Sequence, residues 1–326
     1  MQALVTGGHG FIGSHVCERL VTAGHRVRVL ARNGSDLKNL EGLPVEVVRG
    51  DLLNPESLPA AVEGCDWVFH LAGVLKGFCE SDFVRVNVDG TRSLADACTR
   101  HAPRLSRFIL VSSLAAAGPS PGGLLPVTEK SPSRPISWYG RSKLAGEEAV
   151  RSIANLPWTI IRPPVVLGPR ERDLYRYFRI ARRGFLPVLG FRDRHYSIVF
   201  APDLADGIVR AAETERARGH TYYLCAQEIV TWAQLARMIA KAVGARGHIL
   251  RVPDLAVAAA GKLADVLARV KGTPQMFSSQ KVLEMRQAAW TCSPAKAARE
   301  LDWHAATPIQ EALRRTALWY GEHGWL

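Results

Sequence analysis

Short runs of apolar, often β-branched residues alternate with longer amphipathic segments over the first half of the chain. The runs that resemble strands lie at 3–6, 25–31, 45–50, 67–72, 107–113 and 158–163. Between them, apolar residues recur at helical spacing in the segments 11–23, 55–62, 81–99 and 137–154. Strands that alternate with helices in this way are typical of a parallel sheet with crossover helices. The pattern therefore predicts an α/β fold built on a doubly wound, parallel Rossmann sheet.

The pattern changes after Pro163-Pro164, where isolated strands and helices are mixed with many Arg, Pro and Gly residues. We therefore predict a dinucleotide-binding Rossmann domain at 1–163 and a smaller, discontinuous C-terminal region at 164–326. The second region should be mainly substrate-binding, with some segments returning to the Rossmann body. Its last segment, 307–326, predicts a closing helix that begins at Thr-Pro. The Gly- and Pro-rich stretch 118–123 predicts a loop.

The most apolar helical segment is Leu255–Val270, which Lys262, Asp265 and Arg269 interrupt. It is too short and too polar to cross a membrane, and we expect no transmembrane segment in the chain. We interpret this segment as a core helix or as a lid over the substrate. A helix that lies along a membrane surface is the alternative that the sequence leaves open.

Composition narrows the class of protein. Hydrophobic residues make up 47% of the chain and charged residues 22%, which excludes a disordered or fibrous protein. The net charge of +12 is spread along the chain without a nucleic-acid-binding motif, so we expect no nucleic-acid partner. The six cysteines form no CxxC pair, so we expect neither a metal site nor a disulfide framework. Reduced thiols and a strand that begins near the first residue favour a cytoplasmic protein.

The segment TGGHGFIG at 6–13 joins the first predicted strand to the first predicted helix. Glycines allow the backbone to approach a pyrophosphate, and the helix amino terminus offers N–H groups and a positive dipole end. We expect the residues of this turn to bind the cofactor: Gly7, Gly10, Phe11, Ile12 and Gly13.

The residues after the second strand bear on the choice of cofactor. NAD-specific folds often carry an acid there, whereas this chain has Ala31-Arg32-Asn33-Gly34-Ser35. A guanidinium at Arg32 and a hydroxyl at Ser35 suit a 2′-phosphate, which predicts NADP, with NAD as the alternative. Arg32 could also be an ordinary exposed arginine. After the third strand, Asp51-Leu52 offers a carboxylate to the adenine amino group, or caps the helix near Pro55.

Tyr139 and Lys143 are four residues apart on a predicted helix, so both side chains lie on one face. A nearby ammonium should lower the pKa of the phenol and make Tyr139 a usable acid or base. Ser113 ends the fifth strand and can donate to the substrate oxygen on which charge develops. The three residues together predict an alcohol or carbonyl chemistry.

With these motifs, the chain resembles an extended short-chain dehydrogenase/reductase of the NAD(P)-dependent epimerase/dehydratase superfamily. The resemblance spans almost the whole chain and rests on motifs that follow in family order: TGGHGFIG (6–13), GDL (50–52), HLAG (70–73), NVDGT (87–91), VSS (111–113), YGRSK (139–143) and RPPVVLGP (162–169).

The resemblance implies roles for further residues. Ser113, Tyr139 and Lys143 would be the catalytic triad, with Lys143 also bonding the nicotinamide ribose. Asn87 would orient the helix or a proton-relay water, unless it is only a helix cap. Further cofactor contacts would come from Leu71, Ala72, Gly73, Pro163 and Val165. The helices at 81–99 and 137–154 could form the four-helix bundle of a homodimer.

Departures from the family narrow the chemistry. Leu114-Ala115 stands where dehydratases carry an Asp-Glu pair, so dehydration is not expected. Arg162-Pro163-Pro164-Val165 lacks the asparagine typical of sugar-nucleotide epimerases and resembles the hydroxysteroid dehydrogenase branch. The stretch 31–52 likewise resembles dihydroflavonol-4-reductases.

We therefore expect an NAD(P)-dependent enzyme that interconverts a secondary alcohol and a ketone on a small-molecule substrate. The alternatives are a nucleotide-sugar 4-epimerase that retains NAD, and a non-catalytic dinucleotide-binding subunit. A bulky, apolar substrate is predicted from the residues expected near the site: Leu114, Ala115, Ala116, Ala117, Phe185, Leu186, Val188 and Leu189. An anionic substrate would be expected instead if the pocket were faced by Arg170, Arg172, Arg182 or Arg183.

Overall fold

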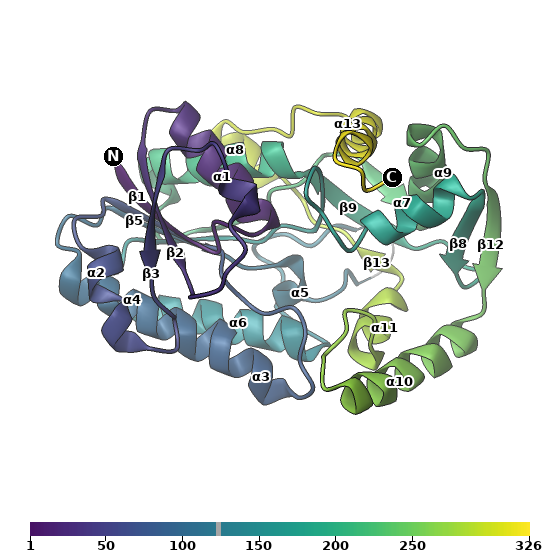
Figure 1. Ribbon diagram of the computed structural model, residues 1–326, viewed down its shortest axis with the longest axis horizontal. Coiled ribbons are helices and arrows are strands. Elements are labelled where there is room, and N and C mark those ends of the chain that lie inside the picture. The colour runs from purple at the N-terminus through teal and green to yellow at the C-terminus, as the bar shows by residue number, and fades with distance from the viewer. Residues whose placement is uncertain (122–124) are drawn as a thin grey trace.

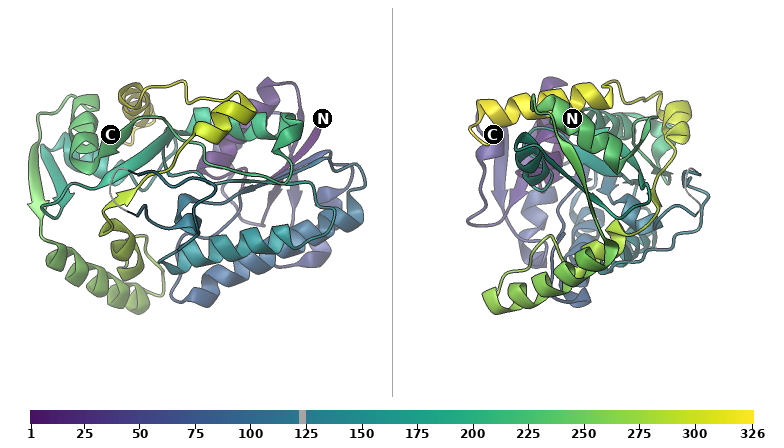
Figure 2. Two further views of the ribbon diagram at one scale, coloured as in Figure 1. Left: turned by 180° about the vertical axis from the view of Figure 1, so that it is seen from behind. Right: turned by 90° about the vertical axis from the view of Figure 1, so that its right-hand side faces the viewer.

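A computed structural model of the chain describes residues 1–121 and 125–326 (Figure 1). The last two residues of the loop predicted at 118–123 lie outside the described residues. One large sheet occupies the amino-terminal half, and a smaller set of strands and helices covers one end of it (Figures 1 and 2).

The large sheet has seven strands in the order β10-β6-β5-β4-β1-β2-β3, and every neighbouring pair is parallel. Its strands are β1 (Gln2–Thr6), β2 (Arg26–Ala31), β3 (Val45–Arg49), β4 (Trp67–His70), β5 (Arg107–Val111), β6 (Trp158–Ile161) and β10 (Thr221–Tyr222). This order reverses between β1 and β4, as in a Rossmann fold. The predicted fold class is confirmed.

Helices cover both faces of this sheet because its strands bury side chains on both sides. In β1, Ala3 and Val5 pack into the core under α1 (Phe11–Thr22) and α8 (Ala201–Glu213). Leu4, between them, packs on the opposite face. The helices of that face are α2 (Pro59–Val62), α4 (Thr91–His101) and α6 (Trp138–Arg151).

The region after Pro163 supplies two smaller sheets and a second core. One sheet joins β7 (Val165–Leu167), β9 (His195–Phe200), β11 (Ile229–Thr231) and β13 (Ala289–Trp290), and the other pairs β8 (Phe185–Leu189) with β12 (His248–Val252). The second core lies among α7 (Tyr175–Arg182), α9 (Trp232–Ala242) and α13 (Ile309–Glu322). Other segments return to the large sheet: β10 forms its edge, and α12 (Ala295–Leu301) lies beside α8.

Two predicted helices differ in detail. The segment 81–99 forms α3 (Glu80–Val84), a π-helical stretch at Arg85–Gly90 and then α4. The segment 55–62 forms a 3₁₀ turn at Pro55–Ser57 before α2, because Pro59 cannot donate a backbone hydrogen bond within a continuous helix.

The predicted helix at 255–270 forms as α10 (Asp254–Lys271), followed by α11 (Ser279–Met285). Its interpretation as a core helix is wrong, because only Gly261 and Ala268 of this helix are buried. Its inner face packs on α11, and its large apolar side chains point outward. Among the described residues, no helix is long and apolar enough to cross a membrane.

Candidate active site

The glycine turn at 7–13 brings β1, β4 and the amino end of α1 into close contact. Gly7 has a φ of +70°, and a Cβ there would lie 2.8 Å from the backbone nitrogen of Ala72. A Cβ at Gly13 would lie 2.1 Å from the carbonyl oxygen of Gly7. Only glycine therefore permits this close path of the backbone.

The amino end of α1 is free to receive an anion. Gly10 is the N-cap in an extended conformation, and within residues 1–121 and 125–326 no side chain caps this helix and no acid occupies its first turn. The end lies where the sheet order reverses, so exposed N–H groups and the helix dipole point to the carboxyl edge of the sheet. These residues fit the pyrophosphate of a dinucleotide.

The loop after β2 places positive charge beside this turn. The carbonyl of Arg32 accepts hydrogen bonds from Arg49 Nη1 at 2.8 Å and from the backbone N–H of Ser35 at 3.2 Å, while the Arg32 side chain is exposed. Burial, and then the charge of Arg32, lower the pKa of His9 in the glycine turn. Arg32 thus lies close enough to the turn to act on a group bound there.

Asp51 does not cap the helix near Pro55, which corrects that alternative. Its Oδ1 accepts from the backbone N–H of Leu53 at 3.0 Å, two residues on, so the carboxylate closes a local turn. Leu52 is buried and faces Gly90, whose Cβ would lie 3.1 Å from the Leu52 side chain.

The structure brings Ser113, Tyr139 and Lys143 together at the end of β5. Ser113 caps α5 (Leu114–Ala117), and Ser137 caps α6 by accepting from the N–H of Gly140 at 3.0 Å. A Cβ at Gly140 would lie 2.4 Å from the carbonyl oxygen of Ala115, so this glycine lets α6 approach α5. The close packing brings the phenol of Tyr139 to the Ser113 hydroxyl.

Burial raises the pKa of Tyr139 to about 12; the hydrogen-bonding contact with Ser113 opposes the rise and the Glu284 carboxylate adds to it. The expectation that Lys143 lowers this pKa is therefore wrong for this structure. The physical reason is that the Lys143 ammonium is directed at the Val111 carbonyl, which it meets at 2.8 Å. Desolvation is the largest of the effects on this half-buried phenol.

Lys143 itself is buried, and desolvation lowers its pKa to about 8, while the Glu147 carboxylate opposes this shift. Glu147 lies one helical turn further along α6. It is fully buried, so the charge of this carboxylate must be balanced within the protein.

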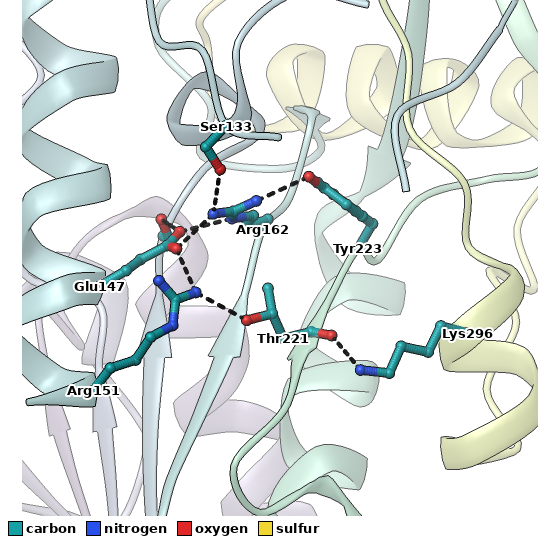
Figure 3. A network of polar contacts seen from close by, with 8 residues as sticks. Ser133, Glu147, Arg151, Arg162, Thr221, Tyr223 and Lys296 are labelled. Atoms are coloured by element: carbon teal, nitrogen blue, oxygen red, sulfur yellow. Dashed lines mark hydrogen bonds and ion pairs between the residues drawn. The ribbon is translucent and has the colours of Figure 1, made fainter. Parts of the chain in front are cut away.

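Figure 3 shows the network that balances Glu147. Arg162, at the end of β6, donates from Nε at 2.8 Å and from Nη2 at 2.7 Å, and Ser112 donates at 2.5 Å. Arg151 adds a bond at 2.9 Å, and the Arg162 guanidinium also meets the Tyr223 hydroxyl at 3.1 Å. The sequence motifs did not predict this network. The sequence does contain one indication of it, because Glu147 follows Lys143 at helical spacing and so lies on the same face of α6.

Asn87 joins the loop after β4 to α6 through hydrogen bonds. Its amide oxygen accepts from the N–H of Val74 at 2.9 Å, and its amide nitrogen donates to the Ser142 hydroxyl at 3.0 Å. It lies inside the π-helical stretch, so it is not a helix cap. A Cβ at Gly73 would lie 2.9 Å from the Asn87 oxygen, which explains a glycine there.

The other predicted cofactor residues border the same edge of the sheet. Leu71 and Ala72 follow β4, and the N–H of Ala72 donates to the Thr6 hydroxyl at 3.2 Å. Pro163 follows β6, and its carbonyl accepts from the N–H of Leu114 at 2.8 Å. Val165 begins β7.

Tyr139 opens into a cavity of about 220 Å³ between the loop after β4 and the α10–α11 hairpin. Its apolar lining includes Leu75, Phe78, Phe83, Met276 and Phe277. The side chains predicted to form this pocket do not line it. The α5 residues are buried against α6, and β8 is occupied by pairing with β12.

The arginine-rich stretch that follows β7 lies elsewhere. Arg172 and Arg183 line a separate hollow beside α7, and Arg170 pairs with Glu18 on α1. None of the predicted arginines lies among the described residues that line the Tyr139 cavity.

Comparison with known proteins finds relatives and a solved structure that are similar over nearly the whole chain. A ceramide reductase from Caulobacter vibrioides is 33% identical over 323 residues, which cover 99% of this chain and 95% of that protein. A 2-alkyl-3-oxoalkanoate reductase from Shewanella oneidensis is 28% identical over 335 residues, which cover 96% of this chain and 85% of that protein. The crystal structure of gox2253 has a TM-score of 0.84 at 28% identity, over 99% of both chains.

Residues 3–225 match the NAD dependent epimerase/dehydratase family, which confirms the resemblance predicted from the sequence motifs. The matched segment includes the glycine turn, Ser113, Tyr139 and Lys143. The chain belongs to the NAD dependent epimerase/dehydratase family.

Proposed function

We propose that the chain is an NADP-dependent oxidoreductase that interconverts a ketone and a secondary alcohol, with Ser113, Tyr139 and Lys143 at the reacting carbon. The observation that carries the proposal is Tyr139, which lines a cavity with apolar and polar walls while its phenol contacts Ser113. An acid at the wall of a cavity can protonate a carbonyl oxygen bound there.

The phenol acts as the acid in ketone reduction. With a pKa of about 12, Tyr139 keeps its proton at neutral pH and can donate it to the substrate oxygen. Ser113 donates a hydrogen bond to the same oxygen as negative charge develops there. The bound cofactor supplies the hydride. In the reverse direction the phenol must first lose its proton, so oxidation of the alcohol is favoured at higher pH.

The cofactor is assigned to the residues at the carboxyl edge of the large sheet. The glycine turn would hold the pyrophosphate, Asp51 and Leu52 the adenine, Pro163 and Val165 the carboxamide. Lys143 would bond the nicotinamide ribose. Asn87 would position Lys143, because its hydrogen bond to Ser142 holds α6 in place. The remaining assigned residues are Gly7, Gly10, Phe11, Ile12, Gly13, Leu71, Ala72 and Gly73.

NADP is favoured over NAD because of the loop after β2. Arg32 is exposed beside the glycine turn, and Ser35 lies in the same loop. A guanidinium can bind a 2′-phosphate with two hydrogen bonds, which a carboxylate at this place would repel.

The substrate is proposed to be a bulky, apolar ketone such as a long acyl chain. The apolar part of the cavity wall supports this, since Phe78, Phe83, Met276 and Phe277 line the cavity together with Tyr139. The names of the relatives agree, because ceramides and 2-alkyl-3-oxoalkanoates both carry alkyl chains.

The test is a spectrophotometric assay of NADPH consumption with a panel of long-chain 3-oxo compounds. We expect consumption in proportion to alcohol formed. Interconversion of UDP-sugars without net use of added cofactor would instead establish a 4-epimerase. No reaction of either kind would favour a non-catalytic dinucleotide-binding subunit.

We also propose a homodimer in which α4 and α6 pack on their copies in a partner chain. Exposed charged residues lie on both helices, including Arg92, Arg141 and Glu148. Light scattering during size-exclusion chromatography tests the proposal, and a monomer at micromolar concentration would overturn it.

A further inference from the structure

The large apolar side chains of α10 lie on one exposed face of the helix. A helix turns about 100° per residue, so residues spaced by three, four and seven positions share a face. Leu263, Val266, Leu267 and Val270 have this spacing, and Leu255 lies two turns earlier on the same side. The exposed fractions of Leu255 and Val270 are 82% and 80%. We name these five residues the α10 outer face.

Positively and negatively charged residues of α10 lie on different sides of the helix. Lys262 and Arg269 border it on one side and Lys271 on the other. The two acids of α10 lie on the inner side: Asp254 pairs with Arg194 at 2.7 Å, and Asp265 accepts from the backbone N–H of Ser279. The outer face is therefore apolar with cationic borders, and both acids of the helix lie on the opposite side, bonded to other parts of the protein.

The inner side of the same helix is part of the candidate active site. Asp265, Ala268 and Arg269 line the Tyr139 cavity, and Gly261 lets α10 lie against Val282 of α11. Figures 1 and 2 both place α10 along the lower edge of the molecule. One helix thus separates the cavity from the surroundings and presents an apolar surface to them.

We propose that the α10 outer face docks on the surface of a membrane containing anionic lipids and delivers an apolar substrate from it into the cavity. Apolar side chains would enter the boundary between headgroups and acyl chains, and the bordering cations would meet the lipid phosphates. A second copy of this chain is a poorer occupant, since it would bring Lys262, Arg269 and Lys271 against an equally cationic face. The substrate-delivery part rests on the proposed function, whereas docking does not.

The test is co-sedimentation of the full chain with vesicles of phosphatidylcholine, with and without phosphatidylglycerol. We expect binding that strengthens with phosphatidylglycerol and weakens with salt. Leu263→Glu with Val266→Glu should reduce binding by about tenfold or more, because two exposed apolar side chains that would enter the membrane become charged. Lys262→Glu with Lys271→Glu should remove the preference for phosphatidylglycerol. The matched control is Leu318→Glu, an exposed leucine of α13 whose loss should leave binding unchanged.

Lack of binding to either vesicle, or binding that Leu263→Glu with Val266→Glu leaves intact, would overturn the proposal. A dimer that this double variant dissociates would assign the face to a second copy and overturn it too. Circular dichroism of the variant confirms that it is folded. Because sedimentation needs no turnover, a failure of docking is distinguished from a failure of the proposed reaction.

Discussion

The two helices that border the cavity, α6 and α10, satisfy their environments in opposite ways. Glu147 of α6 is fully buried and bonded to Arg162, Ser112 and Arg151, and Lys143 is held on the Val111 carbonyl. In α10, large apolar side chains are exposed, and the helix is held mainly through α11. Buried hydrogen bonds, which we name the polar frame of α6, therefore fix the helix that carries the reacting groups. The cavity wall formed by α10 is held mainly by packing on α11, so its displacement should require less free energy.

The largest effect is expected at the reacting group of α6. Tyr139→Phe should lower kcat by about 10²-fold or more, because it removes the general acid and keeps the ring. The dissociation constant for NADPH should remain unchanged, whereas Lys143→Met should impair both turnover and cofactor binding. Steady-state kinetics and fluorescence titration measure the two quantities. Near-normal turnover of Tyr139→Phe would remove this residue from the proposed mechanism.

Removal of the buried Glu147 carboxylate from the polar frame of α6 should cause a large loss of stability. Glu147→Ala leaves the Arg162 charge buried without its carboxylate, which should lower the free energy of unfolding by about 3–5 kcal/mol. Urea denaturation measures the change. The control is Glu311→Ala, which breaks exposed ion pairs of α13 with Arg314 and Arg315 and should have little effect. Equal losses of stability in the two variants would show that the buried bonds of Glu147 stabilise the protein no more than exposed ion pairs do.

Outside the two helices, the exposed Arg32 in the loop after β2 tests the choice of cofactor. Arg32→Ala should weaken NADP binding by about 10- to 150-fold, which corresponds to one charge-assisted hydrogen-bonding contact of about 1.5–3 kcal/mol. Binding of NAD should change far less. Arg26→Ala, at the opposite end of β2, is the matched control. Equal or tighter binding of NAD by the wild-type chain would contradict the assignment of NADP.

The smallest effect concerns the contact between the frame and the wall. Glu284 of α11 accepts from the Ser137 hydroxyl at 2.6 Å, and its charge raises the pKa of Tyr139. Glu284→Gln removes that charge, so the pKa should fall and the pH profile of alcohol oxidation should shift to lower pH by less than about one unit. Glu284→Asp keeps the charge and is the control. An upward shift or none in Glu284→Gln would show that this carboxylate does not act on the phenol.

Much of the fold and part of the candidate site follow from local patterns. Five of the six amino-terminal strands carry buried apolar residues, and β3 at the sheet edge is partly exposed, so the apolar runs predict these strands directly. Helical spacing alone places Tyr139 and Lys143 on one face. The cavity wall could not be predicted in this way. Phe78 and Met276 are far apart in the sequence and meet only when α10 and α11 fold over the loop after β4.

Local patterns along the chain specify the strands and helices of the Rossmann fold, the glycine turn and the placing of Tyr139 and Lys143 on one helix face, because each of these depends on residues within one element or one turn. Tertiary structure alone decided the environment of those residues. It surrounds much of Tyr139 with protein, so that desolvation raises the pKa of the phenol, and it brings Arg162, which follows β6, to Glu147 on α6. It also turns the apolar side of α10 outward, because Gly261 and Ala268, small enough for close packing on α11, lie on the opposite side.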